Sequence, residues 1–130
     1  IIMILNNKIQ IFLALASFMM ALAISLGAFG AHGLKSILDE YMLKIYHTGV
    51  EYHFYNTFGL FIATFLYALK PNSKKIYIAI WLIIIGMCIF SFSLYLLAIL
   101  SMPILGAITP IGGSLLIIAW IIITYEILKN

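Results

Sequence analysis

The most restrictive feature of this chain is a run of 50 residues, 76–125, that contains no Asp, Glu, Lys or Arg. As one helix the run would be about 75 Å long, whereas the hydrocarbon core of a bilayer is about 30 Å thick. It must therefore fold back, and Ser101-Met102-Pro103 favours the turn, because Pro fits the first turn of a helix, where its missing N–H costs nothing. The run predicts two membrane-spanning helices, near 76–100 and 104–127.

Two further charge-free stretches, 9–34 and 52–69, are each long enough for one spanning helix, which we expect near 10–31 and 50–69. Hydrophobic residues make up 65% of the chain and charged residues 8%. So few charges cannot cover the surface of a soluble domain, and they form no basic stripe for nucleic acid. The sequence predicts one all-α domain, 1–130, with four transmembrane helices in an up-down bundle, surrounded by the lipid bilayer.

The lysines predict the orientation of this bundle. With four spans, both termini and the loop between the second and third helices share one side. That side holds most of the lysines, namely Lys8, Lys70, Lys74, Lys75 and Lys129, whereas the other side holds Lys35 and Lys44. The positive-inside rule then places both termini in the cytoplasm. At the opposite, outer boundary we expect interfacial tyrosines, Tyr46 and Tyr95 among them.

The first helix has a second interpretation, as a cleaved signal peptide with Ala21-Leu22-Ala23 as the cleavage site. Its apolar run continues through Ala31, however, and is long enough to span a membrane. We therefore expect a retained helix.

The segment 34–47 has the pattern of a short amphipathic helix. Its apolar residues recur at helical spacing, while the charged ones point elsewhere: Leu34, Ile37, Leu38, Tyr41 and Ile45 against Lys35, Asp39, Glu40 and Lys44. This pattern is typical of a helix that lies in the outer interface. It fits equally well a second helix that extends into water, and both interpretations stay open from sequence.

Small residues in the first and fourth helices predict close helix packing. Two neighbouring faces of the first helix carry them, one with Ala14, Ser17, Ala21, Ser25, Ala28 and His32, the other with Ala16, Ala23, Gly27 and Gly30. Because packing rather than hydrophobicity holds helices together in lipid, we expect the first helix to be the central strut. The candidate packing glycines are Gly27, Gly30, Gly33, Gly106, Gly112 and Gly113, with Gly33 also a candidate helix C-cap.

Polar residues near the outer ends of the helices form the candidate functional site. His32 ends the first helix, and Glu51, His53 and Asn56 lie early in the second. Asn56 is about 7.5 Å of helix rise below Glu51, inside the apolar layer, where its amide needs a partner. These groups either bond a neighbouring helix and fix its register, or line an outward-facing site for a small molecule.

Thr109 and Pro110 complete the candidate site. Pro110 lies two turns inside the fourth helix, where it removes one backbone hydrogen bond. Thr109 before it has the pattern of an N-cap, which would begin a half-helix whose positive end points into the membrane. Such broken helices build binding sites in transporters, whereas a plain kink is the other interpretation.

Three motifs in the chain resemble one known family. They are Gly-Ala-Phe-Gly-Ala-His-Gly-Leu at 27–34, the Tyr52-centred start of the second helix, and Leu-Gly-Ala-Ile-Thr-Pro-Ile-Gly-Gly at 105–113. The family is domain of unknown function 423, small four-helix inner-membrane proteins of bacteria with mitochondrial relatives. The resemblance implies four spans in the bacterial plasma membrane, or alternatively the mitochondrial inner membrane, and implies no activity.

The chain departs from that family in the second helix. The usual motif resembles Tyr-Gln-x-x-His, whereas this sequence reads Tyr52-His53-Phe54-Tyr55-Asn56. A mechanism that needs a histidine at position 56 therefore cannot operate here.

Three functions compete at this point. The small-residue faces favour a non-enzymatic accessory or scaffold subunit, with membrane proteins or further copies as partners, because no nucleophile has a base within sequence reach. The second is a small oligomeric transporter that uses the fourth helix. The third is a haem- or quinone-binding redox subunit with His32 and His53 between helices. We predict no cofactor and no metal, since His47 and Glu51 supply only two ligands.

Overall fold

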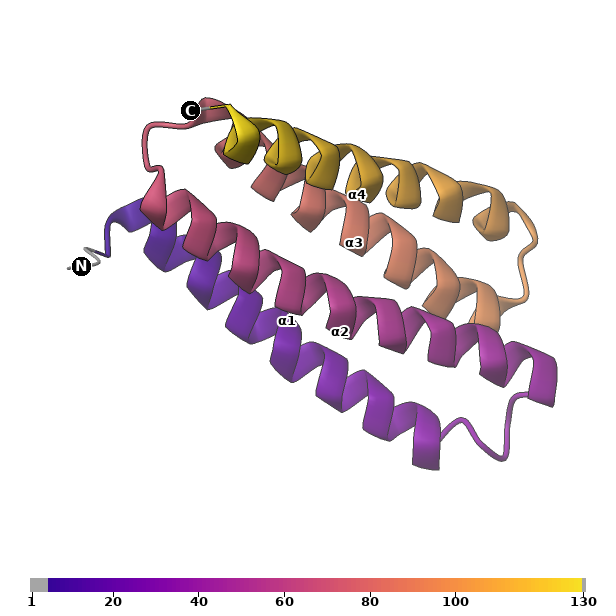
Figure 1. Cartoon of the computed structure of the whole chain (residues 1–130). Helices are drawn as coiled ribbons and strands as arrows, with labels where there is room; N and C mark the ends of the chain where they lie inside the picture. Colours follow the sequence, from indigo (N-terminus) through magenta and orange to yellow (C-terminus); the bar gives the residue numbers. More distant parts are fainter. Residues whose placement is uncertain (1–4, 130) are drawn as a thin grey trace.

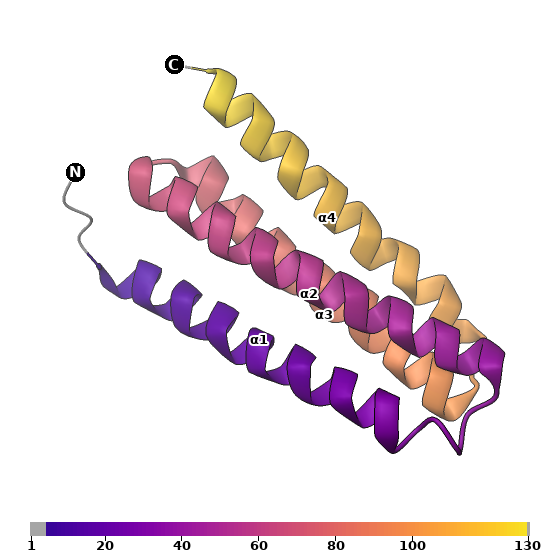
Figure 2. The ribbon, with the colours of Figure 1, turned by 60° about the horizontal axis from the view of Figure 1, so that its bottom comes forward.

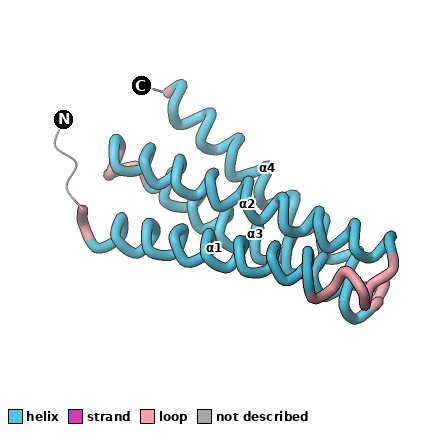
Figure 3. Tube along the Cα trace, turned by 90° about the horizontal axis from the view of Figure 1, so that it is seen from below, coloured by secondary structure: helices cyan, strands magenta, loops and turns pink. Residues whose placement is uncertain are grey.

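The computed structural model describes residues 5–129, and four long helices make up most of them (Figure 1). They are α1 (Asn7–His32), α2 (Glu40–Leu69), α3 (Lys74–Leu100) and α4 (Ile104–Leu128). The prediction of an all-helical chain is confirmed for these residues. The α2–α3 loop lies at the same end of the bundle as both ends of the described chain, and the other two loops lie at the opposite end (Figure 3).

Three of the helices begin at a polar N-cap. The side chains of Asn6, Asp39 and Ser73 accept hydrogen bonds from backbone N–H groups three residues further on, at 2.9, 2.7 and 3.1 Å. Each bond satisfies one of the four N–H groups that the first turn of a helix leaves without a partner. These caps fix where α1, α2 and α3 start.

The segment 34–47 does not form a helix of its own, which corrects the prediction of an interfacial helix. Residues 33–39 form turns, and α2 begins at Glu40 and continues without a break through the membrane-depth residues. The Asp39 cap explains the start, and no proline or turn residue pair interrupts the chain between Glu40 and Leu69. The extension of the second helix, the other interpretation, is the one the structure adopts.

Helix α4 is also continuous, so that no half-helix begins at Thr109. Pro110 lies inside the helix on its exposed side. The Thr109 hydroxyl donates to the Leu105 carbonyl at 3.2 Å, which is a bond within one helix rather than a cap on a new one. The carbonyl four residues before Pro110 belongs to Gly106, and it loses its usual N–H donor because proline has none, while the helix continues past it.

Helices α2 and α3 form the middle of the bundle, with α1 on one flank and α4 on the other (Figure 2). On the α1 side, the Phe12 ring lies 6.2 Å from the Tyr67 ring of α2 and 5.7 Å from the Tyr77 ring of α3. On the α4 side, the Trp120 ring packs onto Gly59 of α2. The backbone of α1 packs mainly on α2 and that of α4 mainly on α3, and these ring contacts reach the second middle helix in each case.

The middle position of α3 corrects the expectation that the first helix is the central strut. Half of the residues in the most apolar stretch of α3 are buried inside the bundle, against 22% in those of α1 and α4. The reason is that only one of the two small-residue faces of α1 is used for packing. Ala16, Ala23 and Gly30 are buried, whereas the face with Ser17 and Ser25 is exposed.

A close approach of two helix backbones lies where α3 crosses α4. A Cβ atom at Gly112 would lie 2.5 Å from the backbone nitrogen of Phe90 and 2.7 Å from the carbonyl oxygen of Gly86. No real side chain fits at those distances. The two backbones therefore touch, and this contact requires glycine on α4.

We expect Gly112→Ala to lower the free energy of unfolding by about 1–3 kcal/mol, because the added methyl group pushes α3 and α4 apart. Gly106→Ala is the matched control on the same helix. Its Cβ would meet only Leu97 Cδ2, at the ordinary distance of 3.7 Å, so we expect no loss there and a gain of up to about 1 kcal/mol from helix propensity. Unfolding of both variants by SDS in mixed micelles measures the difference, and equal effects would contradict the contact.

A second prediction concerns Ser101, which ends α3 with a backbone φ of 54° in the left-handed region. Glycine adopts this conformation without strain, so Ser101→Gly should raise the free energy of unfolding by about 1 kcal/mol. Ser36→Gly is the control, since Ser36 lies in a loop without a positive φ. The same SDS titration applies, and a loss of stability in Ser101→Gly would show that the residue is not strained.

Candidate functional site

In the half of the bundle away from the termini, a buried polar cluster forms around His53. The His53 side chain is fully buried, and its Nδ1 atom lies 2.8 Å from the Tyr95 hydroxyl of α3. Tyr95 in turn packs against Tyr46, with ring centroids 5.1 Å apart, and the Tyr46 hydroxyl donates to the carbonyl of Leu26 on α1. This buried cluster of His53, Tyr95 and Tyr46 therefore joins α1, α2 and α3.

Glycines create the space for the two tyrosine rings. A Cβ at Gly49 would lie 2.8 Å from the Tyr95 ring, and one at Gly30 would overlap the Tyr46 ring. Each ring thus covers a glycine on the neighbouring helix. This arrangement brings the Tyr95 hydroxyl within reach of His53 and the Tyr46 hydroxyl within reach of α1.

Only one of the two ring nitrogens of His53 has a hydrogen-bond partner among residues 5–129. Its ring lies beside the backbone of Met19 on α1, but the Nε2 atom has no hydrogen-bond partner among residues 5–129. A buried polar atom without a partner lowers stability. The bond from Nδ1 to Tyr95 is thus the one that holds the imidazole in place.

Two serines of α3 form further bonds between helices. The Ser91 hydroxyl donates to the Gly49 carbonyl of α2 at 2.8 Å, and the Ser93 and Thr109 hydroxyls lie 2.5 Å apart across α3 and α4. Bonds of this kind contribute about 0.6–2 kcal/mol each in membranes. Together with the cluster around His53, they link all four helices in the same half of the bundle.

The remaining candidate residues do not join this network. The Asn56 amide donates to the Tyr52 carbonyl at 2.8 Å, within its own helix. Glu51 and Pro110 are exposed, and His32 is exposed at the end of α1. The six candidate residues therefore do not form one site.

His32 and His53 lie at different levels of the bundle, His32 exposed at the end of α1 and His53 buried against Tyr95. Gly30 lies against Tyr46; His32 is two residues beyond Gly30 in one direction, and His53 is seven residues beyond Tyr46 in the other. At 1.5 Å of rise per residue, the two histidines are about 13 Å apart along the bundle. Within residues 5–129, moreover, no three side chains of His, Cys, Asp or Glu lie close enough to share a metal ion.

The candidate packing glycines also differ from one another. A Cβ at Gly27 would lie 3.3 Å from Cγ1 of Val50, and Gly30 and Gly112 are covered as described above. A Cβ at Gly33 would meet only the Phe29 residue of its own helix, while those at Gly106 and Gly113 would make ordinary contacts. Gly33 does follow the last residue of α1, but in a right-handed conformation that any residue adopts.

Sequence reasoning placed Tyr46 and Tyr95 in the interface, whereas both are buried and connect helices. The available signal was the spacing of Tyr46, Gly49 and His53, which share one face of α2 at steps of three and four. A tyrosine and a histidine next to a glycine on one helical face indicate a bonded cross-helix contact. Gly59 and Gly86 also lie at close contacts between helices. Neither contact was predicted, because each residue is a single glycine in an apolar run.

Each feature described so far belongs to an integral membrane protein. Helices α1, α3 and α4 are each long and apolar enough to cross a membrane. Helix α2 has the length but carries most of the polar residues in its first half. Several polar side chains, among them His53, Thr57 and Ser91, are buried, while many large apolar side chains are exposed, as in a helical bundle that is surrounded by lipid.

Comparison with known proteins identifies the family. The family described as "Protein of unknown function (DUF423)" matches residues 26–113, and the chain belongs to this family, as the motifs at 27–34 and 105–113 predicted. The UPF0382 membrane protein YwdK of Bacillus subtilis is 42% identical over 120 residues, which cover 92% of this chain and 98% of YwdK. A UPF0382 membrane protein of Haemophilus influenzae is 39% identical, over 97% of this chain and 98% of the relative. No solved structure matches the chain.

We expect Tyr95→Phe to lower the free energy of unfolding by about 1–2 kcal/mol, because it leaves both nitrogens of His53 without a partner while the aromatic packing stays. Tyr55→Phe is the control, since the Tyr55 side chain of α2 is exposed. SDS unfolding in micelles compares the two variants. Equal stability of Tyr95→Phe and the unchanged chain would show that the bond to His53 contributes nothing.

Proposed function

We propose that this protein is a non-enzymatic accessory or scaffold subunit of a membrane complex, in the plasma membrane of a bacterium. In this proposal the chain crosses the membrane four times, with both termini in the cytoplasm. The antiparallel packing of α2 between α1 and α3 supports the fourth crossing, because a helix between two spanning helices shares their depth. The lysines at the end with both termini support the orientation.

The outward face of α1 is the observation that carries the proposal. Ala14, Ala21 and Ala28 line this face, and all are exposed, on the side of α1 opposite its buried residues. The hydroxyls of Ser17 and Ser25 on the same face donate to carbonyls of α1 itself, at 2.8 Å each. Between Ala14 and Ala28 the face therefore carries only small side chains, and both of its hydroxyls are bonded within α1. Small residues of this kind let a second transmembrane helix approach closely.

The closed polar cluster supports a role without catalysis or transport. His53 is fully buried, and its contacts are to neighbouring helices rather than to a cavity. Thr109 and Pro110, which suggested a transport site, lie in a continuous helix. The polar side chains are thus used to hold the bundle together.

Blue-native electrophoresis of the tagged chain, extracted from its native membrane in a mild detergent, tests the proposal. We expect a complex larger than the monomer, which contains another membrane protein or further copies of this chain. In Ala21→Leu the added side chain fills the small-residue face, and the complex should be lost while the monomer stays folded.

Ala107→Leu is the matched control for this experiment. Ala107 is an exposed alanine on α4, away from the small-residue face of α1, and its replacement should leave the complex intact. A lone monomer from the native membrane, or a complex that Ala21→Leu leaves unchanged, would contradict the proposed role.

A further inference from the structure

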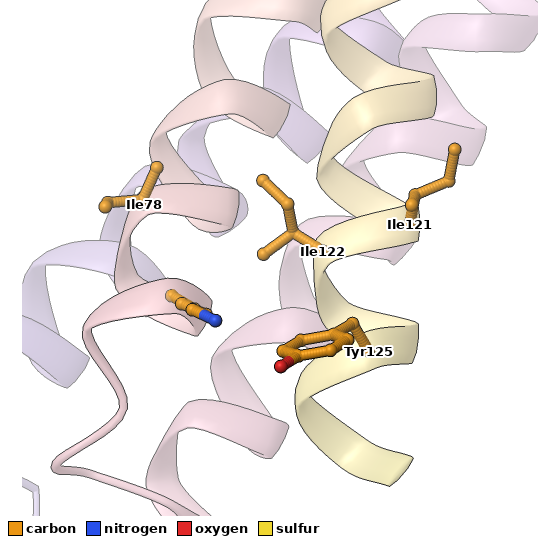
Figure 4. Close-up of a pocket in the computed structure, with 5 residues that line it drawn as sticks. Ile78, Ile121, Ile122 and Tyr125 are labelled. Atoms are coloured by element: carbon orange, nitrogen blue, oxygen red, sulfur yellow. The ribbon is translucent and has the colours of Figure 1, made fainter. Parts of the chain in front are cut away.

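A groove between α3 and α4 opens at the lysine-rich end of the bundle. It has a volume of about 360 Å³ and is lined by Lys75, Ile78, Ile121, Ile122 and Tyr125. Figure 4 shows Ile122 and Tyr125 extending from α4 toward α3, where Ile78 lies. We call this feature the α3–α4 groove. Its floor is apolar, and its polar groups are the ammonium of Lys75 and the hydroxyl of Tyr125.

The polar groups lie at the mouth of the groove, and the apolar floor runs deeper. Lys75 is the second residue of α3, and Ile78 lies about 4.5 Å further along the helix axis. On α4, Ile121 lies about 10 Å before the last helical residue, Leu128. The groove therefore runs from the depth of lipid headgroups into the hydrocarbon layer.

The Lys75 ammonium is held at this mouth. Its Nζ atom lies 4.3 Å from the centre of the Tyr125 ring, a cation–π contact. Glu126, the acidic residue next to Tyr125, is buried and lines a separate polar pocket with Lys70 and Lys129. The positive charge at the mouth is thus available to an anion from outside.

We propose that the α3–α4 groove binds an anionic phospholipid. The Lys75 ammonium and the Tyr125 hydroxyl would contact its phosphate, and one acyl chain would lie along Ile78, Ile121 and Ile122. Charge complementarity selects this ligand, because the same end carries most of the lysines, and anionic lipids are attracted to such clusters at the membrane surface. The ligand must also have a long apolar part, since the groove continues into the hydrocarbon layer.

Native mass spectrometry of the full chain in detergent micelles tests this site, with phosphatidylglycerol and phosphatidylcholine as the two probes. The unchanged chain should retain phosphatidylglycerol in preference to phosphatidylcholine. Lys75→Gln should lower the affinity for phosphatidylglycerol about fivefold, the effect of one lysine near an anionic surface, and leave phosphatidylcholine unaffected. Lys35→Gln, at the opposite end of the bundle, should behave as the unchanged chain.

A second variant tests the apolar part of the groove. Ile122 lines the groove and extends from α4 toward α3 (Figure 4), so Ile122→Trp fills the groove and should lower the retention of both lipids. Ile11→Trp is its control, at a 58% exposed position of α1 in the same half of the bundle.

Three results would overturn the proposal. They are equal retention of the two lipids by the unchanged chain, wild-type affinity for phosphatidylglycerol in Lys75→Gln, and displacement of phosphatidylglycerol by inorganic phosphate, which would indicate a phosphate site without an acyl chain. A partner helix that occupies the groove would instead protect Lys75 from labelling in delipidated complexes. That outcome would also contradict a lipid site.

Discussion

The close approach of α3 and α4 at Gly112 and Gly86 is the contact on which the rest of the structure depends. In lipid, apolar side chains gain nothing by leaving one hydrocarbon surface for another, so helices associate through close packing and hydrogen bonds. The two backbones meet here at distances that no side chain would permit. This contact sets the position of α3 between its neighbours.

The polar bonds in the half of the bundle away from the termini follow from similar contacts. Because Gly49 has no side chain, Tyr95 reaches across α2 to His53, and Ser91 reaches the Gly49 carbonyl. Each of these polar groups would destabilise the protein if it faced lipid alone. Packing and hydrogen bonding are therefore coupled in this bundle, since the glycine that brings α2 and α3 close also brings their polar groups within bonding distance. The surfaces left for interactions are the small-residue face of α1 and the lysine-rich end.

The charge pattern was enough to predict four helices and the approximate ends of three of them, because hydrocarbon thickness and helix rise fix how many residues each needs. The second helix begins ten residues earlier than predicted, at Glu40, because Asp39 caps it there. Ser101-Met102-Pro103 indicated the last loop, because proline fits the first turn of the helix that follows. The sequence could not decide which face of α1 packs, since both faces carry small residues and the choice depends on α2 and α3. It also could not decide whether Pro110 breaks α4, because Thr109 before a proline fits both an N-cap and a residue inside a continuous helix, and the structure has the second arrangement. The hydrogen-bond partner of His53 depends on how α2 and α3 are rotated about their axes. The residue pattern of one helix alone does not specify this rotation.

The central claim is that the polar side chains within the membrane hold the helices together in a dry interior. Water-edited solid-state NMR of the chain in bilayers, with its three histidines labelled with ¹⁵N, tests this most directly, because His32 and His47 are exposed while His53 is fully buried. The structure predicts rapid transfer of magnetisation from water to His32 and His47 and almost none to His53. Transfer to His53 at the same rate as to His47 would place water beside the imidazole, and would contradict the closed interior.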